Sequence, residues 1–156
     1  MPKNSKRLGK AAEERVRRKF LFGWNLKPHC VVRNIASGTY EQEAGDLSFH
    51  LEKCGYLNPH LVVEVKRRKY IPIAMDSKMV RSFLSQVKKE AEKYQSIYGV
   101  APSILLVLVK PYERDFVVYY KLSKESNLQV DSAFPRKGRT MLSIFLKKVK
   151  PVKIKE

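Results

Sequence analysis

Residues 61–69, LVVEVKRRK, place charged side chains inside what is otherwise the sequence of a buried strand. Apart from Glu64, the first five positions are leucine and valine, which are typical of a strand covered on both faces. Glu64 and Lys66 share a face, because side chains two residues apart in a strand point the same way. A charge buried alone is strongly unfavourable, so these two need each other, another charged group or a metal ion.

Four other segments carry the signals of strands. Residues 103–110, SILLVLVK, are apolar on both faces and predict a central strand, and residues 115–122 predict another. Residues 46–52, DLSFHLE, alternate in polarity, which indicates a half-buried strand, and residues 28–33 are a further candidate. We expect residues 46–52 and 61–66 to form an antiparallel hairpin.

Helices are predicted at residues 8–22 and 76–98, where apolar side chains recur at spacings of three and four. Asp76 or Ser77 can cap the second helix at its start. The segment 141–146, MLSIFL, predicts either a short helix or a last strand.

The predicted order of elements is α-β-β-β-α-β-β. It indicates a single α/β domain, residues 1–156, with a central mixed β-sheet flanked by helices. At its ends we expect a loose basic arm, about residues 1–7, and a basic tail, about residues 147–156. The polar stretch 34–45 is long for a connection in a domain of this size, and such connections are often functional.

The chain has 32 Lys and Arg residues against 15 Asp and Glu residues, which gives a formal net charge of +17. A charge of this size disfavours the compact state, so a polyanionic partner is its natural explanation. Nucleic acid is the first such partner. An anionic membrane is the second, but no segment sets a cationic face opposite a wide apolar one. A lysine-rich surface without a partner would carry acidic residues in similar number.

No apolar run is as long as a membrane span, and the basic start of the chain lacks the apolar stretch of a signal peptide. We therefore expect a cytoplasmic protein, in the host cytoplasm if the chain is viral, with no membrane partner. Cys30 and Cys54, with His29, His50 and His60, show no zinc-ligand spacing. We expect them to be ordinary strand and loop residues and, in a reducing compartment, to form no disulfide.

Asp46 opens the strand expected to pair with residues 61–66, which would bring its carboxylate near Glu64. Two carboxylates on neighbouring strands suit Mg²⁺, or Mn²⁺ in its place. Such an ion lowers the pKa of a bound water and neutralises charge on a phosphate. Lys66 can orient that water or stabilise the transition state. Asp46, Glu64 and Lys66 therefore outline a catalytic site for phosphodiester hydrolysis, with Asp46 and Glu64 as metal ligands.

The helix at residues 8–22 can supply a fourth group. At about 100° per residue, Glu13 lies about 60° from the centre of the apolar stripe and Glu14 about 160° from it. Glu13 can therefore face a site beside the sheet, as a catalytic side chain and metal ligand. Glu14 should face water and pair with Arg17 or Arg18.

An Asp, then Glu-x-Lys on the next strand, with a helical Glu upstream, resembles the pattern of the PD-(D/E)XK nuclease superfamily. Within it the chain is similar to the archaeal-type Holliday junction resolvases, a group that phages and archaeal viruses also carry. The similarity covers roughly residues 7–110. The stretches that carry it are Gly9-Lys-Ala-Ala-Glu13, Val32-Arg33, Gly45-Asp46-Leu47, Glu64-Val65-Lys66, Gln86-Val-Lys88 and Tyr98-Gly99-x-x-Pro102.

The resemblance implies a restriction-endonuclease-like core and a homodimeric, Mg²⁺-dependent endonuclease. Such an enzyme nicks two opposing strands of a four-way (Holliday) junction in DNA recombination and repair. The resemblance also implies that Asp46 and Glu64 bind the metal and that Lys66 is the catalytic lysine.

Two family positions match less directly. Spacing from Gly9 assigns the helical glutamate to Glu13, whereas the family's Glu-Arg pair corresponds to residues 14–15. The family also has a serine soon after the strand-end arginine. Here Asn34 follows Arg33, and the nearest serine is Ser37.

Basic residues flank these positions in sequence and are suited to bind phosphates without reading bases. The predicted DNA-binding set is Lys3, Lys6, Arg7, Lys10, Arg33, Ser37, Arg67, Arg68, Lys69, Arg136, Lys137 and Arg139.

Two alternatives remain open. The chain could be another nuclease of the same superfamily that serves restriction or repair. It could also be a non-catalytic DNA-binding protein on the same fold, whose binding would survive the loss of Asp46 or Glu64. Symmetric cleavage of a junction needs two sites related by a two-fold axis, which favours a homodimer.

Overall fold

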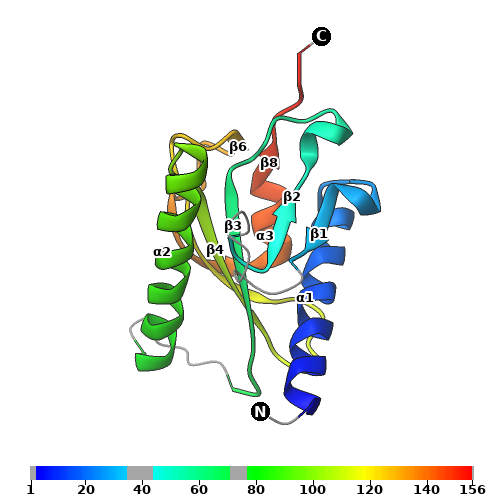
Figure 1. Ribbon diagram of the computed structural model, residues 1–156, viewed down its shortest axis with the longest axis vertical. Helices are drawn as coiled ribbons and strands as arrows, with labels where there is room; N and C mark the ends of the chain where they lie inside the picture. The colour runs from blue at the N-terminus through cyan, green and yellow to red at the C-terminus, as the bar shows by residue number, and fades with distance from the viewer. Residues whose placement is uncertain (1–2, 35–43, 71–76, 156) are drawn as a thin grey trace.

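The computed structural model describes residues 3–34, 44–70 and 77–155 of the chain (Figure 1). With η for a 3-10 helix, its elements are α1 (Lys3–Gly23), η1 (Pro28–Cys30), β1 (Val31–Arg33), β2 (Leu47–Phe49), η2 (Leu51–Cys54), β3 (Leu61–Arg67), α2 (Lys78–Tyr98), β4 (Ser103–Val109), β5 (Val117–Lys121), β6 (Leu128–Val130), β7 (Lys137–Met141), α3 (Leu142–Lys148) and β8 (Val149–Pro151).

The central sheet has four strands in the order β3-β4-β5-β7. β3 and β4 are parallel and are joined through α2, whereas the β4–β5 and β5–β7 pairs are antiparallel. The prediction of a single α/β domain with a mixed sheet flanked by helices is therefore confirmed. One transverse row of this sheet contains Glu64, Leu106, Tyr119 and Arg139, in that order.

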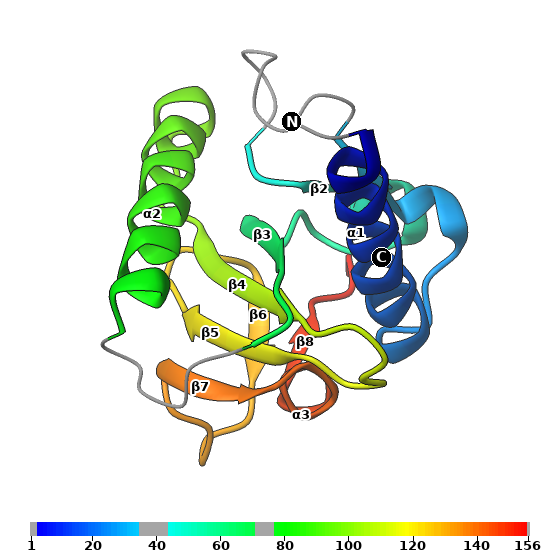
Figure 2. The ribbon, with the colours of Figure 1, turned by 90° about the horizontal axis from the view of Figure 1, so that it is seen from below.

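Helices cover both faces of the sheet, as Figure 2 shows. α1 and α3 pack on one face through fully buried side chains that include Val16, Phe20 and Phe145. α2 packs on the other face, where Val80 and Val87 are fully buried. In the part of the chain that the structure describes, no helix has the length and sustained apolar character that a membrane-spanning segment requires.

The two faces of β3 differ in character because its side chains alternate. Leu61, Val63 and Val65 belong to the core under α1. Glu64 and Lys66 point to the opposite face, where Lys66 Nζ lies 5.4 Å from the ring centroid of Phe83 on α2. The charged positions that interrupt the strand therefore lie on the α2 side of the sheet, at the strand that forms its edge.

α2 begins and ends close to where its periodicity predicted. Ser77 is its N-cap, and the Oγ of Ser77 accepts a hydrogen bond from the N–H of Val80 at 3.2 Å. Asp76, the other candidate cap, lies outside the described residues.

The predicted hairpin between residues 46–52 and 61–66 is wrong. β2 pairs antiparallel with β1, and β3 pairs with β4. After β2 the chain turns into η2, which buries Leu51 completely. An apolar residue at this spacing can be buried from a single helical turn as well as from a strand, so alternation alone did not distinguish the two.

The start of the chain differs from the expectation, and the predicted basic tail has defined structure. α1 begins at Lys3, so the predicted loose arm is helical from that residue onward. In the predicted basic tail, β8 pairs with β6, and the carbonyl of Val149 accepts a hydrogen bond from Trp24 Nε1 at 2.8 Å. The segment 141–146 supplies most of α3, which confirms the helical alternative.

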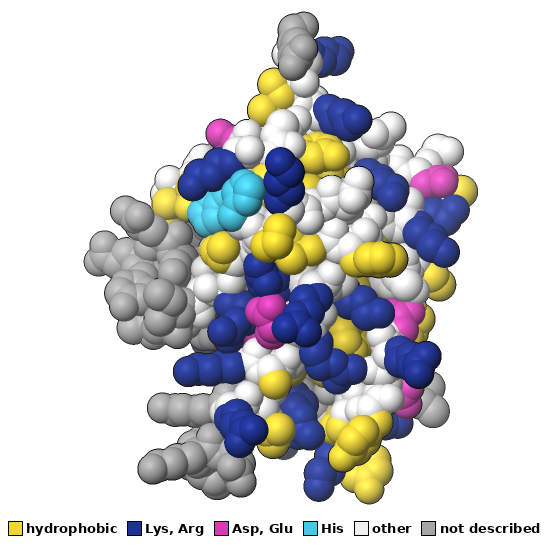
Figure 3. Space-filling model, turned by 90° about the vertical axis from the view of Figure 1, so that its right-hand side faces the viewer, with side chains coloured by type: hydrophobic (Ala, Val, Ile, Leu, Met, Phe, Trp, Pro, Cys, Tyr) yellow, Lys and Arg dark blue, Asp and Glu magenta, His cyan; other side chains and the backbone are white. Residues whose placement is uncertain are grey.

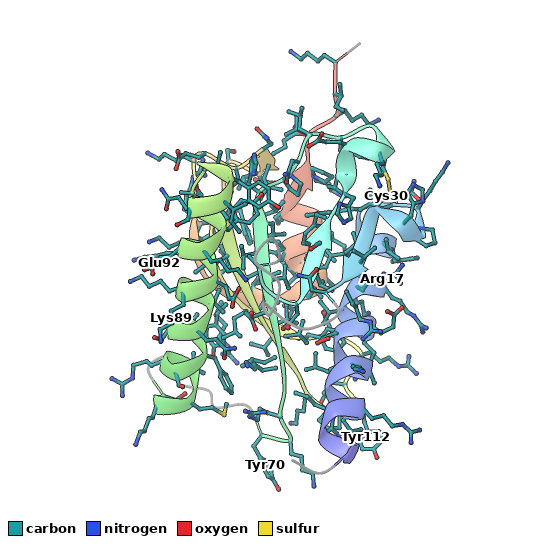
Figure 4. The ribbon with its side chains drawn as sticks, viewed as in Figure 1. Arg17, Cys30, Tyr70, Lys89, Glu92 and Tyr112 are labelled. Carbon is teal, nitrogen blue, oxygen red and sulfur yellow. A yellow bond between two sulfur atoms is a disulfide. The ribbon has the colours of Figure 1, made fainter. Side chains whose placement is uncertain are left out.

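Cys30 and Cys54 form a disulfide, so the expectation of two unlinked cysteines is wrong. Their Cα atoms are 6.3 Å apart, and the N–H of His50 donates to the carbonyl of Cys30 at 2.7 Å. The bond links η1 to η2, which lie side by side in the fold (Figure 4). With 24 residues of separation, the sequence spacing carries no sign of this proximity.

Candidate active site

Asp46 is fixed against the outer edge of β3 by two hydrogen bonds. Its N–H donates to the carbonyl of Val63 at 2.8 Å, and its Oδ2 accepts from the N–H of Val65 at 2.7 Å. These two bonds bracket Glu64, and the carboxyl groups of Asp46 and Glu64 share a hydrogen bond. The expected proximity of Asp46 and Glu64 is therefore present, although no hairpin produces it.

Gly45 allows the chain to approach β3 this closely. Its φ is +77°, and a Cβ at this position would lie 2.6 Å from the carbonyl oxygen of Val63. Any other residue would combine left-handed strain with a clash against the backbone. The N–H of Gly45 donates to Glu90 Oε2 at 3.1 Å, which brings a carboxylate of α2 to the site.

Asn34 holds the Gly45–Asp46 segment from its other side. The N–H of Asn34 donates to the carbonyl of Asp46 at 3.0 Å, and its Nδ2 donates to the carbonyl of Gly45 at 2.9 Å. Among the described residues, Asn34, Asp46 and Glu64 are three of the four buried polar or charged residues, and Ser103 is the fourth. Buried polar groups gathered and hydrogen-bonded at one place are typical of functional sites.

Glu64 is only 5% exposed. Its pKa is raised to about 8, mainly by burial and also by the neighbouring Asp46 and Glu90, although Lys66 acts to lower it. Without a bound cation, Glu64 is therefore largely protonated at neutral pH.

Glu13 approaches the same site from α1. The pKa of Glu13 is raised to about 7, mainly by burial and also by the charge of Asp46, although Arg33, Lys10 and Lys66 act to lower it. Glu13 is thus close enough to sense both Asp46 and Lys66, as expected from its position beside the apolar stripe.

Glu14 lies on another side of α1. Its carboxylate oxygens lie 2.8 Å from Arg17, 3.3 Å from Arg18 and 3.4 Å from Arg33. The predicted pairing of Glu14 with its helical neighbours is confirmed, and the charge of Asp46 acts on Glu13.

The oxygen-rich set fits a hard divalent cation. Asp46 and Glu64 are hydrogen-bonded neighbours and offer the one or two carboxylates that Mg²⁺ takes from a protein. Among the described residues, the oxygens of Asp46, Glu64 and Glu13 do not all lie within 4.8 Å of one another, so Glu13 borders this pair. The mutual repulsion that raises the pKa of Glu64 is what a cation between Asp46 and Glu64 would relieve.

Several predicted DNA-binding residues lie beside Glu13 or follow Glu64 along β3. Lys10 and Arg33 act electrostatically on Glu13. Arg67 ends β3, Arg68 stacks its guanidinium 4.8 Å from the ring centroid of Phe83, and Lys69 follows. Figure 3 shows Lys and Arg side chains spread over the face of the molecule that carries α1 and β1.

Other predicted DNA-binding residues are not brought to the carboxylates. Arg139 and Lys137 lie on β7, the far edge of the sheet, and Arg136 precedes them. Three strand spacings of about 4.8 Å separate β7 from β3, about 14 Å in all. Arg7 lies in the first half of α1 and is exposed. Ser37 and the side chains of Lys3 and Lys6 lie outside the described residues.

Two site residues were missed by sequence reasoning. Glu90 is one of several charged residues on α2, and nothing local marks it as facing the sheet. Asn34 was the residue that departs from the family pattern after Arg33, and its position at the start of the polar stretch was the available signal. A cavity of about 710 Å³ opens beside Asn34 and is lined also by Arg33, Lys53 and Tyr98.

Comparison of the chain with protein-family models, with curated proteins and with solved structures found no match in any of the three. Its function is therefore inferred from the residues of the site alone.

Proposed function

We propose that the chain is a Mg²⁺-dependent, structure-selective DNA endonuclease with a restriction-endonuclease-like core, which acts on four-way junctions. One observation carries this proposal. Asp46 is held beside the buried Glu64 at the edge of β3, with Lys66 on the same face as Glu64.

Each residue has a role that its position supports. Asp46 and Glu64 would hold the cation through carboxylate oxygens, and Mn²⁺ has the same ligand preference. The cation supplies charge neutralisation and acidifies a bound water. Lys66 donates hydrogen bonds to phosphate oxygens as negative charge grows in the transition state. Glu13 borders the same space and can accept a hydrogen bond from a water positioned there.

The charge of the molecule supports a substrate that is recognised through its phosphates. The net charge of +17 favours binding to any nucleic acid, and basic groups follow Glu64 and Lys66 at the end of β3. Recognition through phosphates reads the shape of DNA rather than its bases. Paired, symmetric nicks in a four-way junction require two such sites, so we propose a homodimer as the active species.

The test is cleavage of a labelled four-way junction beside a matched duplex and a matched single strand, with Mg²⁺ or with EDTA. Wild type is compared with Glu64→Gln, which keeps the shape of the side chain. The matched control is Glu92→Gln, because Glu92 is exposed on the outer side of α2 (Figure 4).

We expect symmetric nicks in the junction alone, lost by roughly 10²-fold or more in Glu64→Gln and kept in Glu92→Gln. DNA binding by Glu64→Gln should persist. Equal cleavage of the duplex would indicate a general repair or restriction nuclease instead. Tight binding with no cleavage under Mg²⁺ or Mn²⁺ would indicate a DNA-binding protein whose buried carboxylates are structural.

A further inference from the structure

A second group of metal-binding side chains lies where η1 meets η2. His29 Nε2 and the sulfur atoms of Cys30 and Cys54 all lie within 4.8 Å of one another. His29 is exposed, whereas Cys30 is completely buried. This corner of the molecule lies on the side of the sheet away from α2 (Figure 4). The site described above uses none of these three residues.

The distances suit a thiophilic metal ion. With Zn–S bonds of about 2.3 Å and Zn–N bonds of about 2.0 Å, tetrahedral coordination separates sulfur and nitrogen ligands by roughly 3.5 Å. His29 Nε2 is already 3.8 Å from Cys54 Sγ. The two sulfurs are bonded to each other here, so metal binding requires that this bond be reduced and the sulfurs move apart by side-chain rotation.

The surroundings of Cys54 favour a thiolate there and leave space for one more ligand. A cavity of about 280 Å³ adjoins His29 and Cys54, and Lys27 and Lys53 also line it. Positive charge near a cysteine favours its thiolate form, which is the form that binds metals. Two thiolates with one Zn²⁺ carry no net charge. The cavity gives solvent access for a fourth ligand such as water.

We propose that the reduced protein binds Zn²⁺ through His29, Cys30 and Cys54, at a site separate from the carboxylates. A thiol or phosphine reductant supplies two electrons, and with two protons these convert the disulfide into two thiols. The metal then displaces both thiol protons and forms bonds to two sulfurs and to His29 Nε2. Sulfur and nitrogen ligands select Zn²⁺ over Mg²⁺, whereas the oxygens of Asp46 and Glu64 are ligands that suit Mg²⁺.

The metal and the disulfide are thus alternative cross-links between η1 and η2. The oxidised chain holds the two segments by a covalent bond, and the reduced chain holds them through the ion. This proposal does not depend on nuclease activity, because its ligands and its readout are distinct from those of the carboxylate site.

The test uses the full-length protein, reduced with a phosphine without oxygen and titrated with Co²⁺ and then Zn²⁺. Co²⁺ bound by thiolates gives charge-transfer absorption in the near ultraviolet, and competition with a coloured chelator gives the Zn²⁺ affinity. The variants are Cys54→Ser and His29→Ala. The controls are His50→Ala, which removes a histidine outside the cluster, and Glu64→Gln, which alters the carboxylate site.

We expect one equivalent of metal with thiolate bands in reduced wild type, His50→Ala and Glu64→Gln, and no thiolate bands in the oxidised protein. Cys54→Ser should lose the bands, and His29→Ala should bind Zn²⁺ at least about tenfold more weakly. Since His29 is exposed, its removal tests the site even if the cysteine variant fails to fold. The proposal is wrong if reduced wild type shows no thiolate band, or if His29→Ala binds like wild type. Zn²⁺ binding that Glu64→Gln abolishes and Cys54→Ser retains would place the ion at the carboxylates instead.

Discussion

Asp46 serves the fold and the candidate site with the same carboxylate. Oδ2 accepts the N–H of Val65, which ties the start of β2 to the edge of β3, and the carboxylate also lies beside Glu64. A carboxylate has lone pairs enough for a backbone donor and a further ligand. The short aspartate side chain is suited to this position because its own backbone N–H is bonded to Val63 of the same strand.

Gly45→Ala should destabilise the protein more than strain alone predicts. A non-glycine residue in the left-handed conformation costs about 1–3 kcal/mol. Gly99 has a similar φ of +71°, but a Cβ added there would meet none of the described residues within 4 Å, so Gly99→Ala is the matched control for strain. At Gly45 the added methyl group also meets the carbonyl of Val63. Urea unfolding of both variants measures the difference. Equal losses in the free energy of unfolding would show that the close approach of Gly45 to β3 adds no cost beyond backbone strain.

The metal-free protein should lose stability as pH rises, because of Glu64. Its folded pKa is about 8 against an ordinary value of 4.5, so between these pH values the folded state holds a proton that the unfolded state has released. The free energy of unfolding then falls with rising pH. Glu64→Gln carries no titrating proton. Urea unfolding in EDTA from pH 4.5 to 8 should therefore show a steeper fall for wild type than for Glu64→Gln. Parallel profiles would contradict the raised pKa.

At the scale of elements, the disulfide compensates for short secondary structure. β1 and β2 have three residues each and form a two-stranded sheet of their own. Two strands of this length are marginal without further support. The Cys30–Cys54 bond closes the chain around them, from η1 before β1 to η2 after β2.

Reduction should lower the free energy of unfolding by about 2–4 kcal/mol, the range typical of a disulfide that closes a loop of this length. Denaturant unfolding with and without reductant measures the loss, with a chelator present so that no metal replaces the bond. A variant with both Cys30→Ser and Cys54→Ser should have the stability of reduced wild type and should not respond to reductant. A response in that variant would mean that the reductant acts elsewhere.

Elements with strong periodicity were predictable from the sequence. The apolar run of β4 and the three-and-four spacing of α2 each depend on local pattern, and both were found close to the predicted bounds. The end of β2 was not predictable, because Leu51 fits a strand or a helical turn equally well. The proximity of η1 and η2 could not be predicted from the sequence either, because it depends on how segments far apart in the chain pack together.

The part of the candidate site that was predictable from the sequence is the set of charged residues in and beside β3. Glu64 and Lys66 stand out because charges are rare inside an apolar strand, and Asp46 was expected beside them. We expected a hairpin to bring Asp46 beside Glu64. In the structure, hydrogen bonds from Asp46 to the backbone of β3 hold the Gly45–Asp46 segment there instead. Glu90 could not be singled out, because polar residues on a helix look alike until the facing strand is known.

At the scale of the whole molecule, positive charge is spread across the sheet rather than confined to the surroundings of the carboxylates. Arg139 lies on the far edge, in the same transverse row as Glu64, and its guanidinium lies 5.8 Å from the ring centroid of Tyr119. A phosphate bound there would be about three strand spacings from the carboxylates. In the proposed function, Arg139 would therefore add affinity for DNA without taking part in cleavage.

DNA binding should weaken steeply with salt, since each phosphate contact releases counterions. Arg139→Gln should reduce the slope of log affinity against log salt by about 1 if it contacts one phosphate. Lys155→Gln, an exposed change near the end of the chain, is the control of equal charge. Titration of a labelled junction across salt concentrations measures both slopes. Equal slopes for the two variants would remove Arg139 from the DNA-binding surface.

The Cys30–Cys54 bond also determines whether a single cleavage of the backbone separates the chain into two fragments. The bond makes residues 30–54 a closed covalent ring. A protease cut at any peptide bond within that ring leaves the oxidised protein in one piece, and two fragments separate only after reduction. Asp46 belongs to the ring and Glu64 does not. A single cut in the ring therefore leaves Asp46 attached through one half of the loop, still covalently joined to the chain that carries Glu64.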